Sequence, residues 1–179
     1  MNDPMENELK SQILAVLYAA GRPVSLDEFK HLGQDQEAVL RILTSLEAGL
    51  QQDPSQGVLL ERVAGGWRLV VHPAHLKAVE LVLRPSLPRL SRAAVEVLAI
   101  VAYHQPVTRA EMESLRGRGV EGVLDGLLER ELVKVTGEKD TVGRPKLYGT
   151  TQRFLEIFGL DGLNDLPPVG EGPVLLLRD

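Results

Sequence analysis

Length, composition and charge already exclude several classes of protein. The chain has 179 residues, no cysteine and a formal net charge of −5 at pH 7. This length suits one large domain or two small ones, and the negative charge argues against a protein that coats nucleic acid through charge alone. Without cysteine, disulfides and thiolate metal sites are excluded. The apolar runs are too short to span a bilayer and the start is acidic, unlike a secretory signal, so we expect a cytoplasmic protein without membrane contact.

The first half of the chain reads as three helices followed by a hairpin. An apolar stripe at helical spacing marks a first helix, which ends at Gly21. Residues 25–32 and 35–48 follow as the second and third helices. The letters VLLERVAGGWRLVV then alternate around Gly65-Gly66, which predicts a β-hairpin that turns there. A short helix over residues 74–83 completes this half.

The second half repeats this order with a longer wing. Ser91 and Thr108 are expected to cap its first and second helices, and a third helix runs from about Val120 to Glu131. The letters LVKVTGEKDTVGRPKLYGTT supply two strands joined by a longer, glycine-punctuated connection. Thr151 is expected to cap a closing helix that reaches Phe158.

One sequence pattern, P-V-[S/T]-x-x-E, occurs in both halves after an apolar helical run. The proline ends the preceding helix, the hydroxyl residue caps the next one, and the glutamate three residues later completes a capping box. Ser25 with Glu28 fits this pattern, and so does Thr108 with Glu111. Three helices followed by a β-hairpin are the winged-helix arrangement. We therefore expect an α+β, mostly helical fold made of two tandem winged-helix domains.

The domain boundaries follow from the linker. Pro85 and Pro88 stiffen a connection between the two halves. We place the N-terminal winged-helix domain at residues 1–84 and the C-terminal one at residues 85–166. The remaining residues, 167–179, are rich in Pro and Gly and are expected to form a flexible tail.

The stretch GRGVEG, Gly117–Gly122, spells the G-x-G-x-x-G of phosphate-binding loops. Such a loop must follow a strand within a βαβ unit, but here the letters follow a capped helix. We interpret them as a turn between two helices. Gly117 is expected to have positive φ, and Gly119 is a second candidate for positive φ. His72 and His75 suggest no third metal ligand, and no nucleophile elbow or triad is present. We therefore expect no catalytic site, no metal and no cofactor.

The surface charge of the third helix of the second domain distinguishes a DNA-binding function from a protein-binding one. Its apolar residues between 120 and 128 form the inward stripe, which leaves an acidic line on the outer face. That line consists of Glu121, Asp125 and Glu129. A helix that enters the major groove needs donors and positive charge, so the line is repulsive. Positive charge gathers on the wing instead, which we interpret as a solvated hairpin surface.

Gly122 and Gly126 lie inside the same helix, where each costs about 1 kcal/mol relative to alanine. Two explanations stay open. They could admit the backbone of a partner protein, or they could relieve crowding within the domain's own core.

The second domain resembles a known family. The letters LSRAAVEVLAIVAYHQPVTRAEMESLRG, Leu90–Gly117, resemble the signature stretch of the segregation and condensation protein B (ScpB) family, and residues 137–168 resemble its later segment. One residue departs from the family pattern, because Arg118 stands where an apolar residue follows the Arg-Gly pair. The resemblance implies a non-catalytic accessory subunit of the bacterial SMC–kleisin complex, which supports chromosome condensation and segregation near the nucleoid.

The resemblance also implies partners and contact residues. It implies a homodimer that binds the kleisin ScpA and reaches the SMC ATPase through ScpA, with no sequence-specific DNA binding. Matching the family motifs gives the candidate kleisin contacts Tyr103, Gln105, Arg109, Arg116 and Arg144. For dimerisation we expect contacts from the first domain, at Leu9, Ile13, Leu17 and Trp67, although a core role for Trp67 is equally compatible with the pattern. The alternative function is a tandem winged-helix transcriptional regulator that binds DNA.

Overall fold

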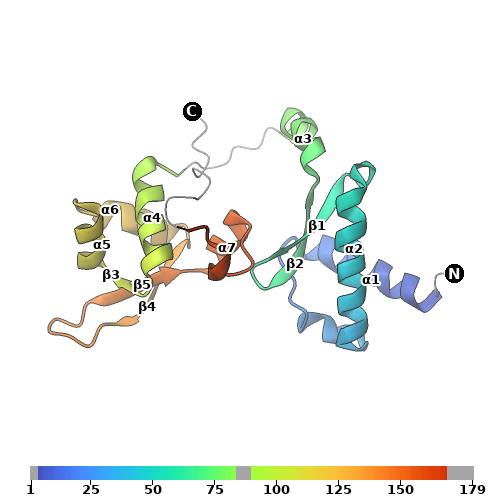
Figure 1. Ribbon diagram of the computed structural model, residues 1–179, viewed down its shortest axis with the longest axis horizontal. Coiled ribbons are helices and arrows are strands. Elements are labelled where there is room, and N and C mark those ends of the chain that lie inside the picture. The colour runs from blue at the N-terminus through green and yellow to red at the C-terminus, as the bar shows by residue number, and fades with distance from the viewer. Residues whose placement is uncertain (1–3, 84–89, 169–179) are drawn as a thin grey trace. The chain divides into compact units, whose positions relative to one another are not determined.

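The computed structural model describes residues 4–83 and 90–168 (Figure 1). By its internal contacts the chain divides into two compact units, Met1–Ser86 and Leu87–Asp179, and each unit has its own hydrophobic core. The linker expected around Pro85 and Pro88, and most of the predicted tail, residues 169–179, lie outside the described residues. Within the described ranges, no helix combines the length and apolar character needed to cross a bilayer.

Unit 1 consists of helices packed on a two-stranded antiparallel sheet. Its main elements are α1 (Pro4–Ala20), the 3-10 helix η1 (Glu28–Leu32), α2 (Gln36–Gln52), β1 (Val58–Val63) and β2 (Gly66–Val71). Short 3-10 helices, η2 (Pro54–Gln56) and η3 (Pro73–His75), precede β1 and the last helix, α3 (Leu76–Leu83). The core lies between α1, η1, α2 and the sheet, where Ile13, Phe29 and Leu43 are fully buried.

Two expectations for unit 1 need correction. The second helix begins at Glu28 rather than at Ser25, and only half of the predicted capping box forms. The Glu28 carboxylate accepts from the Ser25 amide, but the Glu28 amide donates to the Ser25 carbonyl instead of the hydroxyl, which begins a 3-10 turn. The hairpin turns at Ala64-Gly65, both at positive φ, rather than at Gly65-Gly66. Gly66 serves another purpose, since a Cβ there would lie 2.7 Å from the Val24 carbonyl oxygen. Val24 forms a β-bridge with Trp67, which brings its backbone this close.

Unit 2 follows the predicted order of elements. It contains α4 (Arg92–His104), β3 (Val107–Thr108), α5 (Arg109–Arg116), α6 (Glu121–Glu129), β4 (Val133–Glu138), β5 (Lys146–Thr150) and α7 (Gln152–Phe158). The three strands form one antiparallel sheet in the order β3-β5-β4. The side chains of Ser91, Thr108 and Thr151 cap α4, α5 and α7 as predicted, each by accepting a backbone N–H three residues later.

The mostly helical α+β class is confirmed by these elements, and their order in each unit is consistent with a winged helix. In unit 2, α5 and α6 form the helix-turn-helix, and β4 with β5 forms the wing. The wing extends away from the helices in Figure 1. Exposed side chains lie on α4, α5, α6, α7 and the wing.

Candidate partner-binding surface

The outer face of α6 is acidic, as the sequence predicts. Val120, Leu124 and Leu127 are buried in the core of unit 2. All three members of the acidic line are exposed, namely Glu121, Asp125 and Glu129. A DNA phosphate that approached this face would meet the carboxylates of Asp125 and Glu129, and a Glu121 that is already paired with Arg109.

The glycine motif is a turn between helices, as expected. Gly117 ends α5 in the left-handed region at φ 77°, whereas Gly119 does not have positive φ. In α6, a Cβ built on Gly122 or Gly126 would meet no atom within 4 Å. This excludes the explanation that these two glycines relieve crowding within the core. The space beside them is open to a partner.

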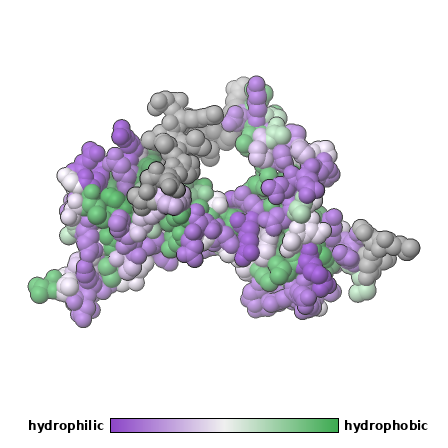
Figure 2. All heavy atoms as spheres, in the orientation of Figure 1, coloured by the Kyte–Doolittle hydropathy of each residue, from purple (hydrophilic) through white to green (hydrophobic). Residues whose placement is uncertain are grey.

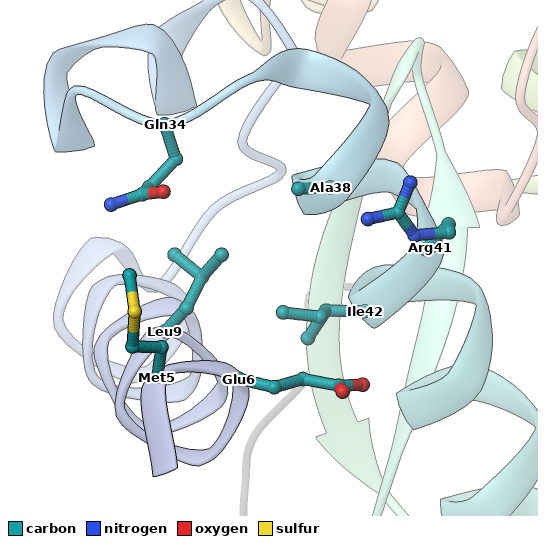
Figure 3. A pocket seen from close by; sticks show the side chains of 7 residues that line it. All are labelled: Met5, Glu6, Leu9, Gln34, Ala38, Arg41 and Ile42. Carbon is teal, nitrogen blue, oxygen red and sulfur yellow. The ribbon is translucent and has the colours of Figure 1, made fainter. Parts of the chain in front are cut away.

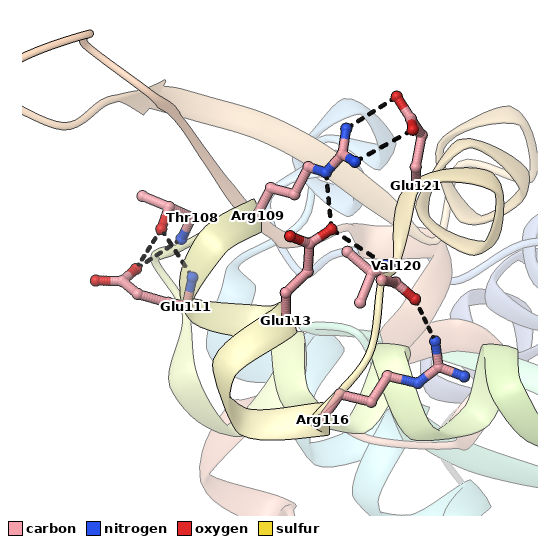
Figure 4. Close-up of polar contacts among 8 residues, drawn as sticks. Thr108, Arg109, Glu111, Glu113, Arg116, Val120 and Glu121 are labelled. Carbon is pink, nitrogen blue, oxygen red and sulfur yellow. Dashed lines mark hydrogen bonds and ion pairs between the residues drawn. The ribbon is translucent and has the colours of Figure 1, made fainter.

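The start of α5 is fixed by a complete capping box (Figure 4). The Thr108 hydroxyl accepts from the Glu111 amide at 3.3 Å, and the Glu111 carboxylate accepts from the Thr108 amide at 2.8 Å. Lys139 of the wing donates to the other oxygen of Glu111. The Lys139 ammonium, followed by the hydrogen bonds from Thr108, lowers the pKa of Glu111 to about 2. The box therefore joins the wing to α5.

Arg109 links α5 to α6 (Figure 4). Its two terminal nitrogens donate to both oxygens of Glu121 at 2.9 and 3.2 Å, and its Nε donates to Glu113 at 3.0 Å. Glu113 also accepts from the Val120 amide at 3.3 Å. Hydrogen bonding to Arg109 lowers the pKa of both carboxyls, and these carboxylates raise the pKa of Arg109. The guanidinium thus fixes the angle between the helices, although its side chain is still about half exposed.

Arg116 holds the turn after α5 from inside. Its side chain is only 7% exposed. One terminal nitrogen donates to the Gly119 carbonyl at 2.7 Å, and the rest of the guanidinium lies 3.4 Å from the Glu96 carboxylate of α4. The structure thus gives Arg116 contacts within its own unit and leaves it little surface for a partner.

Glu96 meets two further arginines, which the sequence reasoning missed. Arg118 lies 3.3 Å from one of its oxygens, and Arg92 lies 3.6 Å from the other. Only the spacing of Arg92 from Glu96, four residues along a helix, is a signal that the sequence offers. The contacts from Arg116 and Arg118 depend on how α4 packs against the α5–α6 turn.

Tyr103 and Gln105 lie at the C-terminal end of α4. The Tyr103 ring is partly exposed and its hydroxyl donates to the Pro167 carbonyl at 2.6 Å. The Gln105 amide nitrogen donates to the Ala102 carbonyl and the Thr150 hydroxyl, and its oxygen accepts from the Thr150 amide at 2.8 Å. Gln105 therefore joins α4 to β5, while Tyr103 is the more accessible of the two.

Two hollows flank Pro106, and the sequence reasoning did not anticipate them. One has a volume of about 370 Å³ and is lined by Gln105, Pro106, Thr136, Leu147, Gly149 and Leu163. The other, of about 350 Å³, is lined by His104, Pro106, Val107, Glu111, Ser114 and Leu115. Leu163 and Leu115 are exposed at 42% and 53%. In the sequence, Leu115 is notable only as an apolar residue that lies outside the inward-facing apolar stripe of α5.

Arg144 lies in the loop of the wing at positive φ and pairs with Glu138 at 3.2 Å. Its side chain is largely exposed. Val142, two residues earlier, is fully exposed, and Figure 2 shows a hydrophobic group at the far end of the wing. The wing therefore carries both apolar and cationic groups that are accessible.

The four residues expected to make dimer contacts are all buried in the core of unit 1. They are Leu9, Ile13, Leu17 and Trp67. Arg62 further covers the Trp67 ring, with its guanidinium carbon 5.4 Å from the ring centroid. None of the four offers exposed surface to a second copy. The same helical periodicity marks a core face and an interface, so the sequence does not separate them.

Exposed apolar surface in unit 1 lies elsewhere. Tyr18 projects from α1, and no residue of α3 is buried. The exposed apolar side chains of α3 are Leu76, Leu81, Val82 and Leu83. A separate hollow of about 220 Å³ lies between α1 and α2, where Leu9 and Ile42 form its floor and Glu6 and Arg41 lie at its rim (Figure 3).

The histidine pair is engaged with backbone groups. His72 caps η3 by accepting from the Ala74 amide, and His75 contacts the Pro54 carbonyl at 2.7 Å. Across residues 4–83 and 90–168, no three His, Asp or Glu side chains gather in a way that could hold a metal ion.

Comparisons with known proteins agree with one another. A family model described as the segregation and condensation complex subunit ScpB matches residues 11–169. Segregation and condensation protein B of Moorella thermoacetica is 45% identical over 164 residues, which cover 91% of this chain and 84% of the relative. The protein of that name from Myxococcus xanthus is 43% identical over 166 residues, or 92% of this chain and 50% of the relative. The crystal structure of ScpB from Mycobacterium tuberculosis is 33% identical and covers 89% of this chain and 99% of its own, with a TM-score of 0.41.

Proposed function

We propose that this chain, which belongs to the family of segregation and condensation complex subunit ScpB, is a non-catalytic subunit that binds the kleisin ScpA through unit 2. Through ScpA it would reach the SMC ATPase and support chromosome condensation and segregation. We further propose that it acts in the cytoplasm, at the nucleoid, as a homodimer.

The observation that carries this proposal is the acidic outer face of α6. In a winged helix that reads DNA, this helix would enter the major groove. Here the exposed charged residues of the helix are Glu121, which pairs with Arg109, and Asp125 and Glu129. Such a face suits a polypeptide partner better than a polyphosphate. The open space beside Gly122 and Gly126 would let a partner backbone approach closely.

The surface that we propose for ScpA runs across the end of α4 and the hollows beside Pro106. Leu115 and Leu163 would each receive an apolar side chain of the partner. Fully burying one such side chain is worth about 1.5–3 kcal/mol, which offsets part of the entropy lost when a flexible segment becomes ordered. Among the residues named from the sequence, Tyr103, Gln105, Arg109 and Arg144 have accessible side-chain surface and stay in this proposal. We leave Arg116 out because it is buried.

For the homodimer, we propose the exposed apolar face of α3 in place of the four buried residues. Leu81, Val82 and Leu83 are more exposed than most apolar side chains of unit 1. Light scattering on the full chain is expected to give the mass of a dimer. Leu81→Glu and Val82→Glu together are expected to give a monomer, and a dimer mass in this variant would exclude α3.

Calorimetry of the full chain with purified ScpA tests the main proposal. We expect saturable binding, and we expect Leu115→Glu with Leu163→Glu to weaken it by about tenfold or more, because charge would occupy both hollows. Ile157→Glu on α7 is the matched control, since Ile157 is exposed but lines neither hollow. Absence of ScpA binding by the unmodified, folded chain would contradict the proposal.

A further inference from the structure

The arginine cluster around Glu96 carries an excess of positive charge. Three guanidinium groups, those of Arg92, Arg116 and Arg118, lie within 4 Å of this one carboxylate. Each guanidinium has five N–H donors and is always charged. With only one carboxylate among three guanidinium groups, the cluster has a local charge of about +2. Most of its N–H donors therefore have no charged acceptor within the cluster. Such a site attracts a second anion.

The three arginines differ in accessibility. Arg116 is 7% exposed and fixed by the Gly119 carbonyl, so it acts as a buried positive charge. Arg92 and Arg118 are 86% and 67% exposed. They meet different oxygens of Glu96, Arg92 at Oε1 and Arg118 at Oε2. An incoming carboxylate could therefore accept from Arg92 and Arg118 while Glu96 keeps its contact with Arg116.

The cluster is aligned with the surface proposed for the partner. Arg92, Glu96 and Tyr103 are spaced by four and then seven residues, which places them on one face of α4. At 1.5 Å per residue, the stretch from Arg92 to Tyr103 is about 17 Å long. A segment that lies along this face would reach Tyr103 at one end and the arginine cluster at the other.

We propose that the arginine cluster binds an acidic side chain of the partner polypeptide, and this inference rests on the proposed function. Arginine pairs carboxylates with good geometry, and clusters of it are a recurrent means of recognising acidic segments. A run of phosphates fits less well, because α6 begins three residues after Arg118 and presents Glu121, Asp125 and Glu129 outward.

The test measures ScpA binding by the full chain carrying Arg92→Ala and Arg118→Ala. We expect binding about tenfold weaker at low ionic strength, together with a shallower dependence on salt. The control carries Lys134→Ala and Arg153→Ala, which change the net charge equally at exposed positions of the same unit. The control is expected to bind within about twofold of the unmodified chain. Both variants should keep the thermal midpoint, because neither removes a buried group.

Each outcome decides a different point. A binding loss of twofold or less in the Arg92→Ala, Arg118→Ala variant, with the unmodified chain binding ScpA, would overturn the inference and leave the proposed function in place. An unmodified chain that does not bind ScpA would overturn both. Parallel titrations use short duplex DNA. If the arginine variant bound this DNA more weakly than the unmodified chain and the control did not, the cluster would be a phosphate site. That result would overturn the proposal that it binds an acidic side chain.

Discussion

The two units contain the same P-V-[S/T]-x-x-E pattern but fold it differently. In unit 2 the Thr108 hydroxyl accepts from the Glu111 amide, and an eight-residue α-helix follows. In both units the hydroxyl donates to the glutamate carboxylate, but in unit 1 the Glu28 amide donates to the Ser25 carbonyl instead of the Ser25 hydroxyl. A five-residue 3-10 helix follows. The same pattern thus begins a turn in both units, and the different acceptor of the glutamate amide accompanies a different kind of helix.

The wings of the two units differ in the connection between their strands. In unit 1, β1 and β2 are joined by two residues, Ala64 and Gly65, which form a tight turn. In unit 2 a longer connection follows β4, and its Lys139 contacts Glu111 on α5. The compact wing of unit 1 completes its core, whereas the wing of unit 2 offers exposed groups beside a helix-turn-helix.

Gly66→Ala in unit 1 should destabilise the protein more than any other single change considered for the two wings. The new Cβ would lie 2.7 Å from the Val24 oxygen and 2.8 Å from its carbonyl carbon, and backbone cannot easily move aside. We expect a loss of about 3 kcal/mol in the free energy of unfolding. Fluorescence of Trp67, the single tryptophan of the chain, reports urea unfolding of unit 1. A loss below about 0.5 kcal/mol would refute the close approach of Val24.

Gly149→Ala is the counterpart in unit 2, with a smaller expected effect. Its Cβ would lie 2.8 Å from Gln105 Oε1 and 2.9 Å from Thr136 Cγ2, which are side-chain atoms that can shift. We expect a loss of about 1.5 kcal/mol, because the Gln105 contacts with Thr150 would be disturbed. Urea unfolding followed by tyrosine circular dichroism measures it. If Gly149→Ala lowers the free energy of unfolding more than Gly66→Ala does, the argument that backbone atoms obstruct a new Cβ more than side-chain atoms do is wrong.

Gly122→Ala in α6 is expected to act in the opposite direction. Because a Cβ there meets nothing within 4 Å, the higher helix propensity of alanine should stabilise unit 2 by about 1 kcal/mol. The same change should weaken ScpA binding if a partner backbone approaches this position. Unfolding and calorimetry on one preparation measure both effects. A destabilised unit 2 would mean that the space beside α6 is already filled.

The smallest expected effect concerns the acid dependence of Glu28 and Glu111, the glutamates of the two P-V-[S/T]-x-x-E patterns. In unit 1, hydrogen bonds from Arg22 and then from Ser25 lower the pKa of Glu28 from 4.5 to about 2, and the pKa of Glu111 falls equally far. A carboxyl whose pKa is lowered by folding stabilises the protein fully above pH 4.5, and this contribution is lost as the pH falls through 2.

Glu28→Gln should therefore flatten the fall of the unit 1 thermal midpoint between pH 4.5 and 2, and Glu111→Gln should do so for unit 2. Trp67 fluorescence follows the first, and amide resonances of α5 follow the second. Each variant is the control for the other, since each should leave the opposite unit unchanged. If a single variant flattened the pH dependence of the thermal midpoint equally in both units, the assignment of Glu28 to unit 1 and Glu111 to unit 2 would be contradicted.

The local signals in the sequence were sufficient for much of unit 2. Ser91, Thr108 and Thr151 cap helices as predicted, because a cap depends on hydroxyl and amide groups three residues apart. Contacts between distant residues could not be predicted this way. Gln105 meets Thr150, which is 45 residues away, and Arg116 meets Glu96, which is 20 residues away. These pairs form only when the helices pack on the sheet.

The functional residues were harder to predict than the fold for the same reason. An apolar stripe such as Leu9, Ile13 and Leu17 has the same periodicity in a core as in an interface, and the structure places it in the core. The sequence predicts Gly66 as a turn residue, but in the structure its lack of a side chain allows the Val24 backbone to approach closely. The hollows beside Pro106 arise where α4, α5 and the sheet meet, so no single segment encodes them.

We propose that the acidic face of α6 excludes DNA and leaves this surface to a polypeptide. Titration of a labelled short duplex at low salt, with the full chain and with an Asp125→Lys, Glu129→Lys variant, tests it directly. We predict no specific binding by the unmodified chain and a measurable gain in the lysine variant, since phosphate contacts would replace repulsion. Sub-micromolar, sequence-specific binding by the unmodified chain, weakened by added salt, would contradict the claim.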